Sequence, residues 1–185
     1  AATTFTPGPA TAAQTTISTD LTILTADGAS TTTITVQTKD SLGNNLTSGG
    51  DTIGLTVNGD ALISPITDIG NGTYTATITN TVAESSTISG TVNSVSIVDT
   101  AVVNFIPGSA STVQSTITSS PSSVTANGVS SSVLPVQAND NPSNNPTSNG
   151  HTVTLNANGS AVIDPVTDKG KRTYKTSITR HVADT

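Results

Sequence analysis

The chain of 185 residues contains no cysteine, methionine or tryptophan, and its aromatic side chains are two phenylalanines and two tyrosines. Without cysteine, neither a disulfide framework nor a thiolate metal site can form. Because aromatic residues are so few, each hydrophobic core must be small and consist mainly of Val, Ile and Leu with Thr methyl groups. No apolar run reaches the roughly 20 residues that a membrane-spanning helix requires, so we expect no membrane insertion. No signal peptide is recognisable, so an exported chain would already have lost it.

Basic residues are also scarce, and the net charge is −6. Residues 1–104 hold eight acids and one base, Lys39. Because nucleic-acid binding needs clustered Lys and Arg, this acidic region argues against a nucleic-acid partner. The five remaining bases are Lys169, Lys171, Arg172, Lys175 and Arg180. They form a candidate ligand patch for a cell-surface receptor or glycan, and the alternative is a solvated turn and strand face.

Helix-forming residues are few, with one glutamate and four lysines, whereas β-branched residues are abundant. Val, Ile and Thr pack well on a pleated sheet, so the composition indicates an all-β fold. The predicted strands of the first hundred residues are Gln14–Thr19, Thr22–Thr25, Ser30–Lys39, Thr52–Val57, Ala61–Thr67, Thr73–Thr79, Thr87–Val92 and Ile97–Phe105. Short strands separated by turns every 8–12 residues or so are typical of a β-sandwich.

The sequence repeats itself with a period of one hundred residues. Residues 5–85 align with residues 105–185 without a gap, and about 35 of these 81 positions are identical. Turn residues keep their positions while strand residues vary within their chemical type, as expected for two copies of one backbone. We therefore expect two domains, residues 1–104 (with residues 1–9 as a leading strand and linker) and residues 105–185. The short Pro-Gly connection between them favours a semi-rigid, end-to-end arrangement.

The second copy stops before its final strands. Nothing after Thr185 matches Ser86–Asn104, whereas Ala1–Phe5 aligns with the closing strand Ala101–Phe105. One interpretation is that the sequence is a fragment of a longer array of repeats. The alternative is strand exchange, in which a neighbouring chain completes the second sandwich, because an incomplete sandwich would expose unpaired backbone groups.

One motif occurs in both copies, as TDIGNGTYTATIT at residues 67–79 and TDKGKRTYKTSIT at residues 167–179. Each copy is predicted to form an Asp-Gly turn followed by a strand that carries the single tyrosine of that repeat. The acids and phenols concerned are Asp68, Tyr74, Asp168 and Tyr174. A carboxylate–phenol pair for proton transfer is the functional interpretation. We favour a structural corner, in which the phenol bonds back to the backbone near the turn.

Other polar residues form no catalytic pattern, and we expect neither an enzyme nor a cofactor. The loop carboxylates Asp27, Asp40, Asp60 and Asp68 offer the oxygen ligands that calcium prefers, so an interdomain calcium ion is an alternative. Asp and Asn in turns more often bond their own backbone, however, and two of these acids are replaced in the second copy. His151 and His181 have no counterpart in the first copy and no nucleophile in recognisable spacing.

The order ADG-S-TTITVQTKDSLGNN, TIGLTVNG, TDIGNGTYTATIT and STISGTV resembles the bacterial Ig-like repeats of the invasin and intimin type. The resemblance covers residues 10–104 and, less cleanly, residues 110–185. It departs from the family pattern at Leu46, where Pro146 of the second copy restores the expected proline, and at Arg172. The resemblance implies two tandem Ig-like β-sandwich domains, the second lacking its last strands. It also implies an extracellular or cell-surface structural or adhesive module, whose partners would be further Ig-like repeats or other copies of itself.

Overall fold

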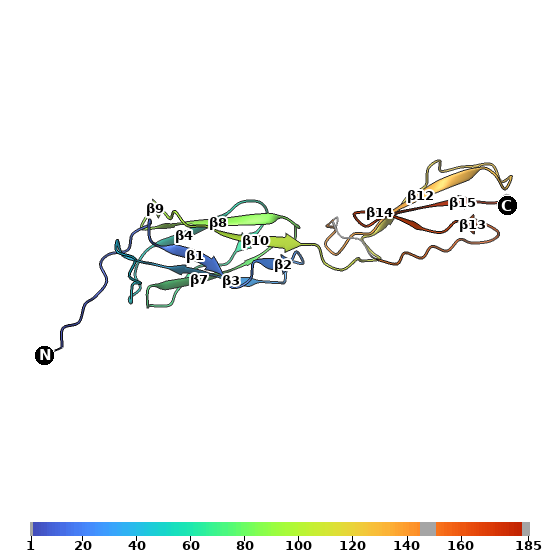
Figure 1. Ribbon diagram of the computed structural model, residues 1–185. Coiled ribbons are helices and arrows are strands. Elements are labelled where there is room, and N and C mark those ends of the chain that lie inside the picture. The colour runs from blue at the N-terminus through green and yellow to red at the C-terminus, as the bar shows by residue number, and fades with distance from the viewer. Residues whose placement is uncertain (1, 145–150, 183–185) are drawn as a thin grey trace. The chain divides into compact units, whose positions relative to one another are not determined.

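The computed structural model describes residues 2–144 and 151–182 (Figure 1). Every regular element in these residues is a β-strand, which confirms the all-β class. The chain divides into two compact units, Ala1–Ile106 (unit 1) and Pro107–Thr185 (unit 2). The repeat places this division two residues earlier, inside the last strand of unit 1. The described residues contain no helix that is long and apolar enough to cross a lipid bilayer.

Unit 1 contains ten strands in two sheets. They are β1 (Thr16–Thr19), β2 (Ile23–Thr25), β3 (Thr32–Gln37), β4 (Ile53–Val57), β5 (Leu62–Ile63), β6 (Thr67–Asp68), β7 (Thr73–Thr79), β8 (Ser85–Val92), β9 (Val95–Ser96) and β10 (Ala101–Ile106). One sheet has the order β1-β3-β7-β5, with β6 paired to β7. The other has the order β2-β10-β8-β4, with β9 paired to β8. Strands β10 and β2 run parallel, whereas the other pairs in unit 1 are antiparallel.

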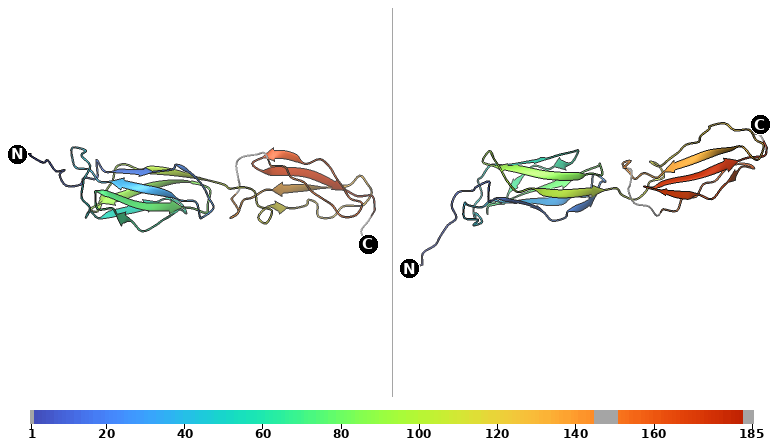
Figure 2. Two further views of the ribbon diagram at one scale, coloured as in Figure 1. Left: turned by 90° about the horizontal axis from the view of Figure 1, so that it is seen from below. Right: turned by 45° about the horizontal axis from the view of Figure 1, so that its top comes forward.

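The core of unit 1 lies between the two sheets (Figure 2). In β3, Ile34 and Val36 are fully buried, while the residues beside them are partly exposed. Strand β7 buries Tyr74 and Ile78 in the same alternating way. The opposite sheet contributes Leu24, Ile88, Val92, Val103 and Phe105. Because side chains alternate between the two faces of a strand, each sheet presents one apolar face to the other.

Three parts of unit 1 differ from the strands expected from the sequence, and one is the predicted strand Ile97–Phe105, which begins only at Ala101. The segment Ala61–Thr67 forms two short strands, β5 and β6, because Pro65 between them has no N–H for a ladder. Strand β9 was not predicted. Asn93 and Ser94 both adopt positive φ, at 49° and 68°, and turn the chain back so that β9 pairs with β8.

Unit 2 contains a single sheet among its described residues. Its strands are β11 (Thr116–Ile117), β12 (Ser131–Gln137), β13 (Val162–Ile163), β14 (Thr167–Gly170) and β15 (Thr173–Thr179). The order is β11-β12-β15-β13, with β14 paired to β15. In this order, the strands of unit 2 lie one hundred residues after β1, β3, β7, β5 and β6. Unit 2 therefore reproduces the first sheet of unit 1.

The second sheet of unit 1 has no counterpart in the described part of unit 2. Residues 123–125 and 153–157, which align with β2 and β4, belong to no strand. In unit 1, β2 pairs with β10 and β4 pairs with β8. A strand needs a neighbour to receive its backbone hydrogen bonds, so these segments form no ladder without counterparts of β8 and β10.

Candidate functional site

Tyr74, the tyrosine of the repeated motif, is fixed inside unit 1. Its side chain is only 2% exposed, on the buried face of β7. The backbone N–H of Asp51 donates a hydrogen bond to the Tyr74 hydroxyl oxygen at 2.8 Å. Burial raises the pKa of Tyr74 above its ordinary value, although the bond from Asp51 opposes this effect. The phenol is therefore neutral at physiological pH and holds the loop that precedes β4.

Asp68 holds the same loop from the other side of the motif. Its carboxylate accepts hydrogen bonds from the backbone N–H groups of Gly50 at 2.9 Å and Gly70 at 2.7 Å. Asp68 and Tyr74 are also register partners in the pairing of β6 with β7. The acid and the phenol thus bind adjacent residues of one loop, Gly50 and Asp51, through backbone groups.

Unit 2 repeats this arrangement with a different loop residue. Tyr174 is buried, and the backbone N–H of His151 donates to its hydroxyl oxygen at 3.1 Å. Asp168 accepts a bond from the backbone N–H of Gly170 at 2.8 Å. Because each tyrosine is bonded by a backbone N–H, replacement of Asp51 by His151 leaves the contact in place. These contacts support the structural corner, which we retain as a proposal.

Asp40, considered from the sequence as a calcium ligand, is instead surrounded by hydrogen-bond donors. Its carboxylate accepts bonds from the backbone N–H groups of Leu42 and Asn44, both at 2.9 Å, and from the Asn44 side-chain amide at 3.0 Å. The backbone N–H of Gly8 donates to the same carboxylate at 3.0 Å. The Asn44 side chain and the Gly8 N–H lower the pKa of Asp40 to about 2. The charged carboxylate therefore ties the Pro-Gly segment to its own loop.

The same contact recurs in unit 2, where it holds the connection between the repeats. The backbone N–H of Gly108 donates to Asp140 at 2.7 Å, and that of Asn144 donates to the same carboxylate at 2.6 Å. In addition, Nη1 of the buried Arg172 donates to the Gly108 carbonyl oxygen at 3.0 Å. Gly108 is thus bound to unit 2 through both its N–H and its carbonyl group.

The residues on either side of this connection belong to different units. Phe105 is 3% exposed and lies in the core of unit 1, whereas Gly108 is bound within unit 2. Only Ile106 and Pro107 lie between them. Sequence reasoning missed this arrangement, although both copies contain Phe-x-Pro-Gly and, 32 residues after its glycine, Asp-x-x-x-Asn. Each part alone is typical of an ordinary turn, and only the structure brings the two together.

The five bases of the predicted ligand patch do not all lie together in the structure. Arg172 is 6% exposed and bonded to Gly108, so its role is structural. Arg180 follows the end of β15, and its Nε donates to the Ser160 hydroxyl oxygen at 3.3 Å. The other three bases lie on the hairpin of β14 and β15, and the turn of that hairpin is at the opposite end of β15.

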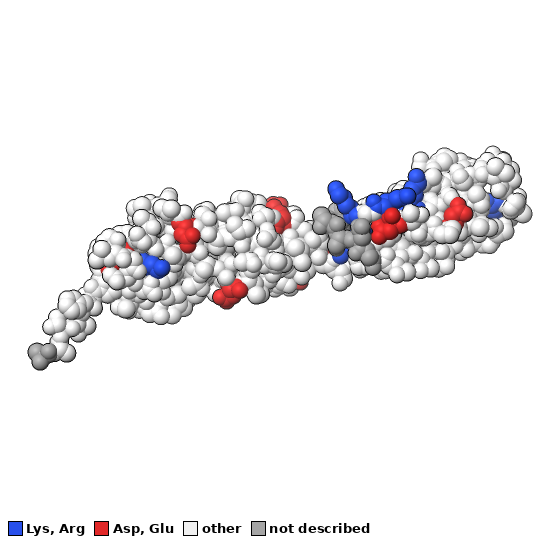
Figure 3. Space-filling view, viewed as in Figure 1, with Lys and Arg blue, Asp and Glu red and all other residues white. Residues whose placement is uncertain are grey.

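Three lysines remain as an exposed group, which we call the lysine hairpin: Lys169, Lys171 and Lys175. Lys175 points away from the core because Tyr174 and Thr176 beside it are buried. Figure 3 shows basic side chains gathered on one face of unit 2, next to acidic ones. The equivalent residues of unit 1 are the uncharged Ile69, Asn71 and Thr75.

Carboxylates do not gather into a metal site in the described part of the chain. Residues 2–144 and 151–182 contain no group of three or more His, Asp or Glu side chains that could hold an ion. Asp27 instead accepts hydrogen bonds from the backbone N–H groups of Ser30 and Ala29, and these bonds lower its pKa. Asp27 thus bonds the backbone of its own turn, which is the alternative to calcium binding considered for the loop acids. His151 joins the tyrosine contact through its backbone alone.

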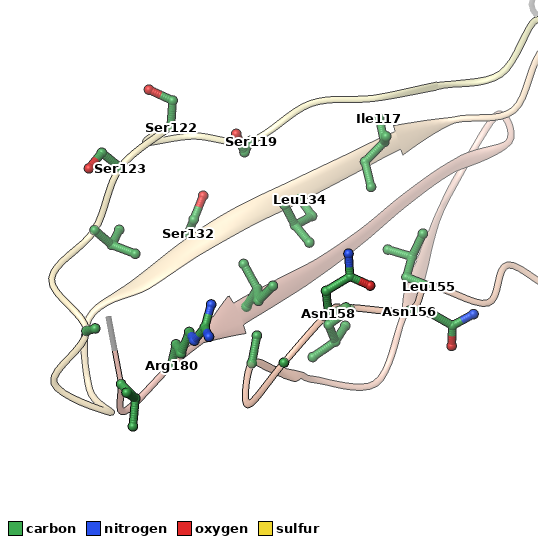
Figure 4. A pocket seen from close by; sticks show the side chains of 18 of the residues that line it. Ile117, Ser119, Ser122, Ser123, Ser132, Leu134, Leu155, Asn156, Asn158 and Arg180 are labelled. Atoms are coloured by element: carbon green, nitrogen blue, oxygen red, sulfur yellow. The ribbon is translucent and has the colours of Figure 1, made fainter. Parts of the chain in front are cut away.

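Unit 2 also has a groove of about 830 Å³ over the face that carries the second sheet in unit 1 (Figure 4). The apolar residues lining the groove include Ile117, Val124, Leu134, Leu155, Ile163 and Ile178. Ile117 is 54% exposed, whereas its equivalent Ile17 is 4% exposed. The apolar face that β8 and β10 cover in unit 1 is therefore open in unit 2.

Several solved structures are similar to the chain. Invasin, a bacterial integrin-binding protein, is 25% identical with a TM-score of 0.67, over 95% of this chain and 36% of invasin. The Escherichia coli adhesin FdeC is 22% identical with a TM-score of 0.60, over 93% of this chain and 57% of FdeC. InvD of Yersinia pseudotuberculosis is 21% identical with a TM-score of 0.59, over 91% of this chain and 49% of InvD. The chain thus spans between about a third and somewhat over half of these structures.

No curated protein sequence matches the chain. The profile of the family described as invasin, domain 3, matches it twice, over residues 11–108 and residues 111–185. The two matches follow the two copies of the repeat and together cover nearly the whole chain. They also confirm the resemblance to invasin and intimin repeats. The chain belongs to the invasin domain 3 family.

Proposed function

We propose that the chain is a stalk segment of a cell-surface adhesin or filament, built from two tandem Ig-like β-sandwich domains. Membership of the invasin domain 3 family supports this proposal, as does the similarity to invasin and FdeC, which are an integrin-binding protein and an adhesin. The proposal places the chain outside the cell and assigns it no catalysis. Its partners are further Ig-like repeats or other copies of the chain, joined by strand exchange.

The observation that carries this proposal is the way the connection is held. Phe105 is buried in unit 1, and Gly108 is bonded to Asp140 and Arg172 in unit 2. The connection therefore has two residues outside these anchors, and one of them is Pro107, whose ring fixes φ. A linker this short and stiff supports a semi-rigid spacer rather than a flexible tether.

Backbone ¹⁵N relaxation of the 185-residue chain tests the proposal. We expect both units to report one shared, slow rotational correlation time. Insertion of Gly-Ser-Gly-Ser after Ile106 should shorten that time and make the two units differ. Asp140→Ala provides a second variant, which loosens the anchor without changing the length of the linker. Independent tumbling of the two units in the unaltered chain would contradict a semi-rigid stalk.

A second candidate function is binding of an anionic surface glycan through the lysine hairpin. The observation in its favour is that three exposed lysines project from one hairpin, while the same hairpin of unit 1 has none. Opposite charge raises the encounter rate with a polyanion and makes binding dependent on salt.

Exchanging these residues for those of unit 1 tests this candidate with little risk to the fold. The triple variant is Lys169→Ile, Lys171→Asn and Lys175→Thr, and the matched control is Lys39→Thr in unit 1. Retention on immobilised heparin should decrease in the triple variant and stay unchanged in the control. Equal retention of all three proteins would reject the lysine hairpin as a binding site.

A further inference from the structure

We propose that the lysine hairpin binds a linear anionic polysaccharide lengthwise, with Lys175, Lys169 and Lys171 contacting successive sulfate or carboxylate groups of the polymer. This binding mode rests on the second candidate function above, because it specifies how the same hairpin meets its ligand. Three features of unit 2 carry it. They are the unpaired ammonium groups of the lysines, the order of the lysines along the hairpin, and the fixed backbone from which they project.

The three lysines have no counter-ion of their own in the described part of the chain. Among residues 2–144 and 151–182, their ammonium groups form no hydrogen bond or ion pair. The neighbouring acid Asp168 accepts a hydrogen bond from the backbone N–H of Gly170 instead. In a chain with a net charge of −6, three exposed and unpaired bases on one hairpin are free to attract an external anion.

The register of the hairpin places the lysines in order along its length. Lys175 of β15 lies opposite Thr167, the first residue of β14. Lys169 follows two residues after Thr167, and Lys171 follows two residues later, in the turn. Because alternate residues of a strand are roughly 7 Å apart, the lysines occupy three successive positions at about this spacing. A linear polymer lying along the hairpin therefore meets one lysine after another.

The ladder of this hairpin contains a β-bulge that the lysines share. The pairing of β14 with β15 shifts between Asp168 and Gly170, so Lys169 is an extra residue in the ladder. In unit 1, by contrast, the ladder of β6 with β7 ends at Asp68. Bulges redirect a side chain and are frequent beside functional sites. The bulge thus supports a role for Lys169 beyond that of a solvated loop residue.

The turn of the hairpin has a strained backbone. Lys171 and Arg172 both have a φ of 51°, in the left-handed region that residues with a side chain rarely adopt. Unit 1 has Asn71 and Gly72 at these positions, and Asn-Gly is the sequence that tight hairpin turns favour. Backbone strain of this kind persists where the surrounding structure enforces it, and it clusters at binding sites. The strain therefore supports a functional role for Lys171.

Contacts around the turn hold it in this conformation. The side-chain amide of Gln137 donates a hydrogen bond to the Lys171 carbonyl oxygen at 3.3 Å. The backbone N–H of Ala138 donates to the Arg172 carbonyl oxygen at 3.0 Å. The guanidinium group of Arg172 is itself bonded to the Gly108 carbonyl oxygen. The lysines thus project from a backbone that is fixed before a ligand arrives, which reduces the entropy lost on binding.

The salt dependence of binding tests how many charges act together. The probe is a fluorescently labelled heparin hexasaccharide, titrated with the 185-residue chain over a series of sodium chloride concentrations. Three contacts should give a slope of about −2 to −3 when the logarithm of the association constant is plotted against that of the salt concentration. Lys171→Asn and Lys175→Thr should each weaken binding about two- to fivefold and bring the slope closer to zero by about 1.

A second oligosaccharide identifies the anionic group. Hexagalacturonate carries carboxylate groups and no sulfate, so its titration under the same conditions separates the two chemistries. Binding of hexagalacturonate with the same slope would assign carboxylate groups as ligands, whereas binding of heparin alone would assign sulfate groups. Both results support lengthwise binding, because both require the three lysines to act together.

An exchange of residues between the units separates the order of the lysines from net charge. Lys175→Thr combined with Thr75→Lys keeps the net charge at −6 and moves one lysine to the equivalent strand of unit 1. We expect this chain to bind heparin as weakly as Lys175→Thr alone. Binding as tight as that of the unaltered chain would overturn the inference, because total charge would then determine affinity.

The possible outcomes also distinguish this binding mode from the function on which it rests. If the triple lysine variant loses retention on heparin but the unaltered chain has a slope of only about −1, the hairpin remains a binding site and lengthwise binding is overturned. Unchanged retention of the triple variant would reject both. Self-association at low salt in analytical ultracentrifugation, without binding of either oligosaccharide, would also overturn the inference, because the acidic unit 1 of a second copy would then be the ligand.

Discussion

The two units share one backbone pattern but differ in how completely their apolar faces are covered. In unit 1, two sheets enclose a core in which Ile34, Val36 and Ile78 are fully buried. In unit 2, the equivalent first sheet is present, but the enclosed cluster consists of Val136, Ala138 and Tyr174 with partly buried neighbours. Two copies of one repeat thus show a closed core in unit 1 and an open groove in the described part of unit 2.

This difference shows that strand formation in these repeats depends on partners distant in the sequence. Residues 123–125 and 153–157 have the alternation of β2 and β4 yet form no strand. Strands β8 and β10 supply the missing hydrogen-bond partners in unit 1, and both are distant in sequence from the strands they complete. Local propensity alone therefore does not determine the second sheet.

The largest expected contrast concerns the core. Ile34→Ala should destabilise unit 1 by about 3–4 kcal/mol, because it leaves a cavity in a closed core. Leu134→Ala should cost unit 2 only about 1–2 kcal/mol, since its surroundings already open into the groove. Hydrogen exchange followed by mass spectrometry resolves the two units within one chain. Equal losses in both units would show that the groove is closed in solution.

A second contrast concerns residue 72 of the repeated motif, which is glycine in unit 1 and is replaced by Arg172 in unit 2. Gly72 has a φ of 81°, and a Cβ there would collide with the carbonyl group of Leu46. Gly72→Arg should therefore destabilise unit 1 by about 2–4 kcal/mol, through backbone strain and the collision. The reverse change, Arg172→Gly, should mainly release Gly108 and increase hydrogen exchange at residues 107–110. Tolerance of Gly72→Arg would show that the two loops are interchangeable.

Removal of the tyrosine hydroxyl group should lower the stability of both units by a similar amount. Tyr74→Phe and Tyr174→Phe each leave a backbone N–H of the adjoining loop without its partner, at a cost of about 1–2 kcal/mol. Thermal unfolding of the two variants measures this cost. A neutral effect in either unit would remove the support for the structural corner in that unit.

The smallest expected effect is a loss of stability of unit 1 at acidic pH. The pKa of Asp40 is about 2, below its ordinary value, so its contacts stabilise unit 1 above about pH 4 and are lost as the pH falls toward 2. Asp40→Asn should remove this part of the pH dependence in unit 1. An NMR titration of the Asp40 carboxyl group checks the pKa directly. An ordinary value would show that the bonds from the Asn44 side chain and the Gly8 N–H are absent in solution.

Much of the fold could be predicted from the sequence because turn residues mark the strand ends and alternation marks the buried faces. Ile34 and Tyr74 lie on the faces that their spacing indicates. The role of Arg172 could not be predicted, since a base in a run of bases gives no sign that its side chain is buried against Gly108. The contacts of Asp40 and Asp140 were missed for a related reason. They join segments 32 residues apart, and no local pattern records that distance.

The parallel pairing of β2 with β10 has a mechanical consequence for a protein under tension. Strand β2 lies near the start of unit 1, and β10 leads directly into the connection. Tension along the chain draws the two strands in opposite directions along their axes, so their ladder is sheared and its bonds must break together. Unit 2 has no such pair among its described residues, and its strands can be separated one bond at a time. In an optical trap, unit 1 should therefore unfold at a higher force than unit 2.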